Sequence, residues 1–432
     1  MKARVYRRQV RVAIGAKAAP VGQLTFVRDG RREYSCFGYS AEWLHSPERF
    51  EVSPDLPLQT EFVTRGAPSA LDSPFPCAIA DTAPDAWGKR IISRAHVKRR
   101  ANDPGLGSLT AIDYLAAVDD FSRIGALRLV DEKGRFLGSG DQYRTPQLVD
   151  LGRVSAAARR VEEGTEDYAD LDYLQGKATS LGGLRPKCTV IDEDGSLAIG
   201  KFPSLHDERP IVRSEVLALR LLAHAGCQSA VARVIRVENT DIAVVRRFDR
   251  TAGGARIHYL SGGSLLQARR EEDRSYTEIA DAIRRISAAP SDDLRELWRR
   301  LLINLLITNV DDHLWNVGFL YAGEGRWRLS PAFDVNPFPD KERESKTWLS
   351  EVSGPITSLE QLLSEAEYFD MKRVDAEQVA GNMATKLGQW RTLAVSPEIG
   401  LNERDVVELE PAFEHESARQ ARGLATAESR HS

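Results

Sequence analysis

The chain has 432 residues, of which 42% are hydrophobic and 28% are charged, and its formal net charge is −4. This composition is ordinary for a globular protein, and the length is sufficient for two or three domains with their own cores. The small net charge gives no reason to expect nucleic acid or an anionic membrane as a direct partner.

The cysteines and the N-terminus bear on the cellular compartment. Cys36, Cys77, Cys188 and Cys227 are scattered, without the C-x-x-C spacing of a structural zinc site. They are typical of thiols in a reducing compartment, so we expect a cytoplasmic protein. The basic N-terminus is not followed by an apolar signal core, and no stretch is long enough to span a bilayer.

The first third of the chain mixes short strands and helices. The predicted strands cover residues 10–14, 22–28, 33–39 and 124–130, and the predicted helices begin near Asp85 and at residue 111. We therefore expect a mixed α+β unit over residues 1–147, without a catalytic cluster. Trp43 and Trp87 are expected in its core or at an interface rather than in chemistry.

A glycine pair follows in a segment that precedes a predicted strand. Gly182 and Gly183 stand between Ser180 and the basic residues Arg185 and Lys187. Glycine lets a backbone approach phosphate closely, and its N–H groups can face phosphate oxygens. The Walker A pattern is absent, and the segment alone is more typical of a plain turn before a hairpin.

The next elements place a lysine and a glutamate in a suggestive order. Lys201 lies in an apolar strand, where a lysine either reaches for the edge or meets an anionic ligand. Glu215 follows in an amphipathic helix over residues 211–225. A strand lysine followed by a helix glutamate is the order that positions ATP phosphates in protein kinases. A plain solvated glutamate is the alternative.

A second hairpin, over residues 231–237 and 242–250, ends at the predicted hinge Arg246–Phe248. After it the pattern becomes largely helical. We expect a second unit over residues 148–250, a helical unit over 251–418 and a frayed, polar tail over 419–432.

The most informative stretch is residues 301–318, in which an apolar helix gives way to acids and amides. Asp311 and Asn316 have the D-x-x-x-x-N interval that separates base and metal ligand in kinase catalytic loops. Asp334 follows a predicted strand pair, as the second metal-binding acid does in kinases. A hairpin between them would fold both acids onto one cleft, which suits magnesium held together with ATP phosphates.

The loop also has a simpler interpretation, because Asp and Asn often cap helices and start turns. Asp312 could be such a residue, and His313 could hold the shape of the loop. On the loop alone this interpretation is favoured. The later Phe333-Asp334 motif shifts the balance towards phosphoryl transfer.

Taken in order, the motifs resemble those of the HipA-type serine/threonine kinases, the toxins of bacterial HipBA toxin–antitoxin modules. The resemblance runs nearly end to end, and its motifs are Phe75-Pro76 to Gly88, Gly125-Ala126-Leu127, Ser180 to Lys187, Arg247 to Arg250, Asn309 to Asn316 and Leu329 to Val335. It implies a bilobed, protein-kinase-like α+β fold with an extra N-terminal α/β subdomain and a helical C-terminal lobe.

The resemblance also implies roles for single residues. Asp311 corresponds to the catalytic base, and His313 supports its loop. Asn316 and Asp334 correspond to the Mg²⁺ ligands. The ATP-binding positions are Gly182, Gly183, Leu184, Arg185, Pro186, Lys187, Lys201, Glu215, Arg246, Arg247 and Phe248. Ser180 is the autophosphorylation position that switches the family's kinases off. Arg246 departs from the glutamate often found there, so an adenine contact would come from the backbone.

The implied activity is that of an ATP- and Mg²⁺-dependent protein serine/threonine kinase. Its expected substrate is an aminoacyl-tRNA synthetase, glutamyl-tRNA synthetase above all, or another translation protein. Its expected partner is a HipB-like antitoxin, through which alone it would contact DNA. Two alternatives stay open: a small-molecule kinase of the aminoglycoside-phosphotransferase type, and a silent scaffold that binds an antitoxin. The four intact residues Lys201, Asp311, Asn316 and Asp334 argue against the scaffold.

Overall fold

The structure is a computed structural model that describes residues 5–69, 71–138, 145–175 and 185–428. It divides into two compact units. The first unit contains residues 1–206, 237–240 and 246–260, and the second contains residues 207–236, 241–245 and 261–432. The expected three-part division at residues 147, 250 and 418 stays a prediction.

An antiparallel five-stranded sheet forms one part of the first unit, with the strand order β4-β3-β2-β1-β5. The strands are β1 (Tyr6–Ile14), β2 (Ala19–Asp29), β3 (Arg32–Tyr39), β4 (Val63–Gly66) and β5 (Leu127–Val130). Alternate residues of β2 enter the core, since Leu24 and Phe26 are fully buried and Gln23 is exposed. The strands predicted over residues 10–14, 22–28 and 33–39 are present, and the one predicted over 124–130 begins only at Leu127.

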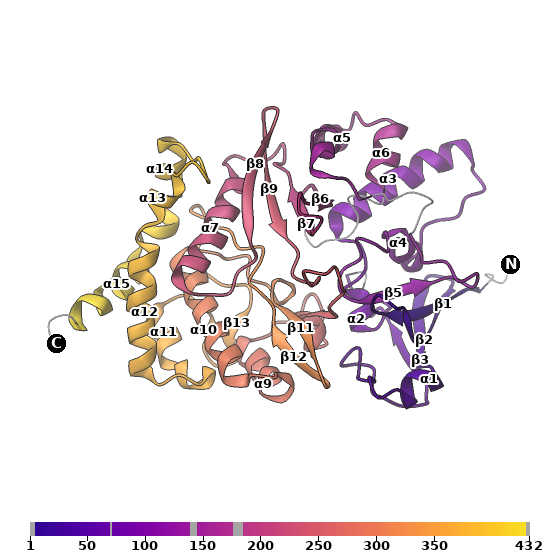
Figure 1. The fold of residues 1–432 in the computed structure, drawn as a ribbon, viewed down its shortest axis with the longest axis horizontal. Helices are drawn as coiled ribbons and strands as arrows, with labels where there is room; N and C mark the ends of the chain where they lie inside the picture. Colours follow the sequence, from indigo (N-terminus) through magenta and orange to yellow (C-terminus); the bar gives the residue numbers. More distant parts are fainter. Residues whose placement is uncertain (1–4, 70, 139–144, 176–184, 429–432) are drawn as a thin grey trace. The chain divides into compact units, whose positions relative to one another are not determined.

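Helices complete this unit (Figure 1). They are α1 (Ala41–His45), α2 (Cys77–Ala80), α3 (Ala86–Asn102), α4 (Ala111–Ala117), η1 (Leu148–Asp150), α5 (Leu151–Glu163) and α6 (Tyr168–Leu174). Asp85 caps α3 by accepting from the Gly88 N–H at 2.6 Å. Trp43 and Trp87 are buried, as predicted. All four cysteines are thiols, not disulfides.

A short hairpin in the first unit carries the two lysines singled out in the sequence. Its strands are β6 (Lys187–Ile191) and β7 (Leu197–Lys201), which pair antiparallel. In this register Lys187 lies directly opposite Lys201. Directly opposite residues project to the same side of a sheet, so both lysines share one face of the hairpin.

The second unit is mostly helical around α10. Among the described elements, three strands contain residues assigned to both units, namely β8 (Ala232–Val237), β9 (Thr240–Arg246) and β10 (Tyr259–Ser261). The remaining elements are α7 (Ile211–Ala225), α8 (Gly262–Leu265), α9 (Tyr276–Ile286), α10 (Pro290–Leu306), η2 (Leu314–Asn316), β11 (Gly318–Gly323), β12 (Arg326–Leu329), β13 (Trp348–Ser350), β14 (Gly354–Pro355), α11 (Leu359–Ser364), η3 (Ala366–Phe369), α12 (Arg373–Leu387), α13 (Trp390–Ala394), α14 (Glu403–Phe413) and α15 (Glu416–Glu428).

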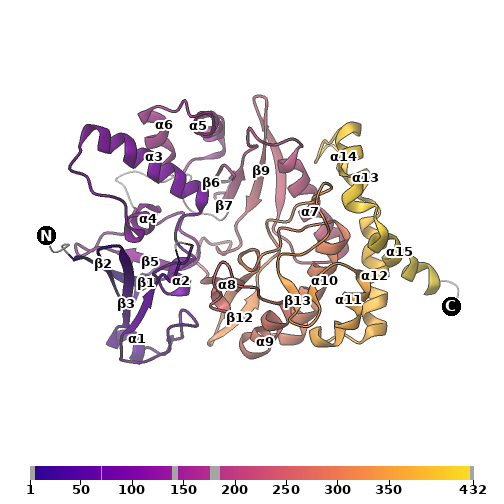
Figure 2. The same cartoon turned by 180° about the vertical axis from the view of Figure 1, so that it is seen from behind.

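Helix α10 lies among α9, α11, α12 and β12 and holds the core of the second unit (Figure 2). Its start follows from Pro290 at the first helical position and from Asp292 and Asp293 in the first turn. Trp298 in its middle is fully buried. No helix among the described residues has the length and apolar character required to cross a membrane.

The C-terminal tail differs from its prediction over the residues that the structure describes. Residues 419–432 were expected to fray, but α15 continues to Glu428. Ala418 and Ala421 are buried, and α15 packs against α12. The polar composition of the tail obscured this, because the contact is made by small residues that add little to hydrophobicity.

Candidate active site

The loop after α10 begins with a sharp change of direction. Thr308 adopts a positive φ of 53°, which is uncommon for a β-branched residue and ends the helix. Its hydroxyl donates to the Ala412 carbonyl at 3.0 Å, so the turn is anchored to α14. The well-packed helix therefore delivers the polar residues that follow at a fixed position.

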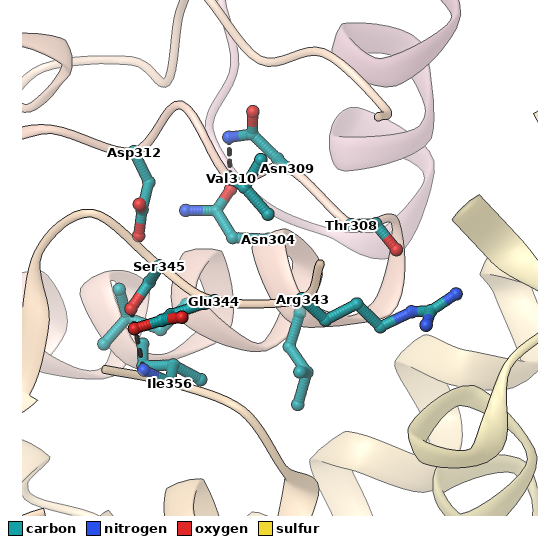
Figure 3. A pocket seen from close by; sticks show the side chains of 11 residues that line it. Asn304, Thr308, Asn309, Val310, Asp312, Arg343, Glu344, Ser345 and Ile356 are labelled. Atoms are coloured by element: carbon teal, nitrogen blue, oxygen red, sulfur yellow. Dashed lines mark hydrogen bonds between the residues drawn. The ribbon is translucent and has the colours of Figure 1, made fainter. Parts of the chain in front are cut away.

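Asn309 ties the loop to the helix on one side and to the chain beyond Asp334 on the other. Its backbone N–H and its side-chain Nδ2 donate to Asn304, at 2.8 and 2.9 Å. Its Oδ1 accepts from the Asn336 N–H at 3.2 Å. Figure 3 shows the amide pair among the residues that line a small pocket, to which Asp312 also belongs.

Asp312 is directed into the interior and holds the loop by hydrogen bonds to neighbouring segments. It is buried, and its Oδ2 accepts from the Tyr276 hydroxyl at 2.9 Å while its Oδ1 accepts from the Lys346 N–H at 2.7 Å. Its carbonyl accepts from the hydroxyls of Tyr276 and Thr347, at 2.8 and 2.9 Å. Burial raises the pKa of Asp312 to about 6, against the effect of these donors. Asp312 is thus an anchor that joins three segments, rather than a simple turn residue.

Asp311 faces the other way. Its side chain is 43% exposed, and its Oδ1 forms an ion pair with the Lys346 ammonium. Its carbonyl accepts from the Asn316 Nδ2 at 2.8 Å, which closes the loop across the D-x-x-x-x-N interval. The interval seen in the sequence therefore has a direct physical cause, since the amide holds the backbone of the acid.

The pKa of His313 is affected by Asp334 as well as by Asp311. Burial lowers the pKa of His313, the charges of Asp311 and Asp334 oppose this effect, and the cations Lys346 and Arg270 add to it. The charges of both predicted acids therefore act on the His313 imidazole. Asp334 has a positive φ of 57°, an unusual conformation that functional sites often contain.

Lys187 lies at the start of β6 in the first unit and is buried. Its ammonium is 3.7 Å from Oδ2 of Asp85, the cap of α3. Burial raises the pKa of Asp85 to about 7, although Lys187 counteracts this effect. The Lys187 side chain is therefore part of a buried ion pair. Lys201, across the hairpin, is half-buried at the end of β7.

The predicted hinge residues also differ in their surroundings within the first unit. Arg246 is exposed and forms an ion pair with Asp194. Arg247 is buried, with donors on both Asp249 oxygens at 2.8 and 2.5 Å and on the Ser122 carbonyl at 2.5 Å. This network makes the Arg247 side chain structural. Phe248 packs near Tyr259, with ring centroids 6.4 Å apart.

The structure describes some of the remaining predicted site residues and not others. Glu215 is buried in α7 of the second unit, so the solvated-glutamate alternative is wrong. Arg185 is exposed and Pro186 is buried in the first unit. Ser180, Gly182, Gly183 and Leu184 lie outside the described residues.

Sequence reasoning missed two partners of the site. Lys346 pairs with Asp311, and Tyr276 donates to Asp312, from 35 and 36 positions away. Neither residue carries a motif, so no local pattern could have identified it.

Comparison with known proteins finds a family match and named relatives. Residues 179–391 match the family model of the HipA-like C-terminal domain. A Sinorhizobium fredii protein named "Putative kinase Y4mE" is 25% identical over 404 residues, which cover 88% of this chain and 84% of that protein. A Haemophilus influenzae protein named "Putative kinase" is 24% identical over 202 residues, 40% of this chain and 58% of that protein.

The fold has a solved counterpart. In the structure of the Shewanella oneidensis MR-1 toxin–antitoxin complex of HipA, HipB and operator DNA, one chain matches with a TM-score of 0.64 and 16% identity, over 97% of both chains. That similarity shows a shared kinase-like α+β fold. The domain match over residues 179–391 and the two named relatives support a HipA-type kinase.

Proposed function

We propose that this chain is an ATP- and Mg²⁺-dependent protein serine/threonine kinase. The observation that carries the proposal is the loop in which Asp311 is exposed while its neighbour Asp312 is buried and hydrogen-bonded to two other segments. Such a loop holds an exposed carboxylate in place without using it for packing. Fixed carboxylates of this kind suit general-base catalysis.

In the proposed reaction Asp311 takes the proton of a serine or threonine hydroxyl. The hydroxyl oxygen bonds to the γ-phosphorus of ATP, the bond from that phosphorus to the bridging oxygen breaks, and ADP leaves. Asn316 keeps the backbone of Asp311 in place, and His313, whose pKa burial lowers, supports the loop as a neutral ring. Most of the acceleration would come from positioning and electrostatics.

Asn316 and Asp334 would hold the magnesium ion. Because the Asn316 Nδ2 is used on the Asp311 carbonyl, its Oδ1 is the amide atom that points elsewhere. One amide oxygen and one carboxylate suit Mg²⁺, which takes few protein ligands and completes its shell with phosphates and water. Across the described ranges no cluster of three or more His, Cys, Asp or Glu suits a metal, which fits an ion that depends on ATP. When bound, the ion would neutralise phosphate charge.

The other nucleotide contacts would come from Lys201, positioned by Glu215, and from the loop over residues 182–187. The hinge over residues 246–248 would face adenine through its backbone. Since the side chains of Lys187 and Arg247 are held in buried ion pairs, we expect them to support this site rather than touch ATP.

We base the proposed regulation and partners on the resemblance to the HipA-type kinases. We propose that Ser180 is autophosphorylated and that this inhibits the kinase. The target would be a translation protein, such as glutamyl-tRNA synthetase or another aminoacyl-tRNA synthetase, in the cytoplasm. A HipB-like antitoxin would bind the chain and link it to DNA, as the names in the Shewanella complex suggest for that HipA.

The deciding experiment uses ATP labelled at the γ-phosphate and a lysate depleted of nucleotides. The unmodified chain should label protein, and Asp311→Asn should lower the rate by roughly 10² to 10⁴-fold, the usual contribution of a general base. Asp281→Asn, at an exposed carboxylate of α9, should leave the rate unchanged. Peptide mapping should find phosphate on Ser180.

Other outcomes would point elsewhere. Label on a metabolite instead of protein would favour the small-molecule kinase. No transfer by the unmodified chain would favour the antitoxin-binding scaffold. An active Asp311→Asn variant would remove the base assignment.

A further inference from the structure

A lysine outside every recognised motif touches the proposed base. Lys346 precedes β13, and its ammonium pairs with the Asp311 carboxylate. The two side chains are 57% and 43% exposed, so the pair is open to solvent.

The backbone beneath this lysine is firmly held. The Lys346 N–H donates to the buried Asp312 Oδ1, and the Thr347 hydroxyl donates to the Asp312 carbonyl. Ser345 continues the anchoring, since its hydroxyl donates to the Thr347 carbonyl at 2.7 Å and accepts from the Ile356 N–H at 2.7 Å. Figure 3 shows Asp312 directed at the segment that carries Ser345. The backbone of Lys346 is therefore held in place.

The ion pair itself is easily exchanged. Solvent-exposed ion pairs contribute little to stability, and a lysine ammonium moves on a flexible four-carbon chain. A more highly charged anion nearby could draw the ammonium away from Asp311 at little cost, while the backbone stays in place.

The position next to Asp311 brings such an anion within reach. This step rests on the proposed function. A base lies about 3 Å from the hydroxyl oxygen it activates, and that oxygen lies about 3 to 3.5 Å from the phosphorus before attack. A cation in contact with Asp311 is therefore within one lysine side chain of the transferred phosphoryl group. The second cation near His313 is less mobile, because Arg270 stacks over Trp315 at 3.8 Å.

We propose that Lys346 is a catalytic residue that binds a non-bridging oxygen of the transferred phosphoryl group. Its ammonium moves from Asp311 to that oxygen, which leaves the carboxylate available for the hydroxyl proton. Lys346 stays protonated throughout, and the proton released by the hydroxyl ends on Asp311. Charge on the phosphoryl oxygens is thereby stabilised where the reaction develops it.

The test measures kcat and KM for MgATP with the full chain, from ATP hydrolysis and from phosphate transfer to the chain itself. Lys346→Ala and Lys346→Met should lower kcat on the order of 10²-fold, as loss of one charge-stabilising donor does, with KM changed less than about two-fold. Lys346→Arg should retain more activity than either. The matched control is Lys341→Ala in the same segment, whose ammonium lies over Phe338 and should not affect turnover.

Thermal unfolding separates chemistry from folding, because each variant keeps the Lys346 N–H that bonds Asp312. Equal kcat for Lys346→Ala and the unmodified chain would overturn the proposal. A raised kcat would overturn it too, since the lysine would then be an inhibitory cap. A raised KM with constant kcat would reduce the lysine to simple ATP binding. If the unmodified chain turns over no ATP, the proposed function fails together with this inference.

Discussion

Asp311 and Asp312 are chemically identical neighbours with opposite surroundings. Asp311 is half exposed beside a lysine, whereas Asp312 is buried and bonded to Tyr276 and to the backbone of Lys346. Environment sets the role of a carboxylate, and here it separates an exposed acid, the proposed base, from a buried support. The sequence interval singled out Asp311, but it did not show that Asp312 is a buried anchor.

The support role predicts a pH-dependent effect of Tyr276→Phe. This change removes the hydroxyl that donates to Asp312 Oδ2 and leaves a buried carboxylate short of one donor, which costs about 1 to 3 kcal/mol. Since the pKa of Asp312 is about 6, the carboxylate is charged at pH 8 and largely neutral at pH 5. Urea unfolding should therefore show a larger loss of stability at pH 8 than at pH 5.

Tyr368→Phe provides the matched control for this prediction. Its hydroxyl donates to Asp281 at 2.8 Å on an exposed surface, where loss of a hydrogen bond is replaced by water. Its effect should be small at both pH values. A loss for Tyr276→Phe that is equal at pH 5 and pH 8 would contradict the anchoring role of the Asp312 charge.

At the scale of elements, small residues decide how α12 and α15 meet. A Cβ added to Gly381 of α12 would lie 2.7 Å from the Ala425 backbone nitrogen of α15. The two helices can approach this closely only because Gly381 has no side chain. The contact explains why a polar C-terminal segment, predicted to fray, forms an ordered helix.

Two glycine substitutions test this contact. Gly381→Ala should destabilise the chain by about 1 to 3 kcal/mol, because the overlap outweighs the gain in helix propensity of about 1 kcal/mol. Gly423→Ala, within α15, has no atom within 4 Å of the new Cβ and should stabilise by up to about 1 kcal/mol. Thermal unfolding compares them directly. Similar shifts in both variants would show that α15 is not docked at Gly381.

At the scale of the whole molecule, local features were predictable and distant contacts were not. The helix over residues 211–225, the β6–β7 hairpin and the D-x-x-x-x-N loop follow from periodicity, turn residues and spacing. The pairs Asp85–Lys187 and Asp311–Lys346 depend on how the chain returns over itself, 102 and 35 positions apart, so no sequence window contains them. The same holds for His258, whose ring reaches a carbonyl 206 positions earlier.

His258 carries the last prediction, on how the first unit responds to acid. Its Nε2 donates to the Val52 carbonyl at 2.7 Å, and burial lowers the pKa of His258 to about 4 from its ordinary 6.5. The folded chain therefore keeps the ring neutral where the unfolded chain protonates it. The contribution of the neutral ring to the free energy of unfolding is complete above pH 6.5 and is lost as the pH falls through 4. The total loss is up to about 3 kcal/mol. The variant His258→Gln tests this prediction, because glutamine keeps an N–H donor but has no titratable group. The difference in the free energy of unfolding between the unmodified chain and this variant should shrink by about 2 to 3 kcal/mol from pH 7.5 to 4.5. A difference that stays constant over this range would mean that the ring is solvated and that the return segment over residues 246–260 does not close on Val52.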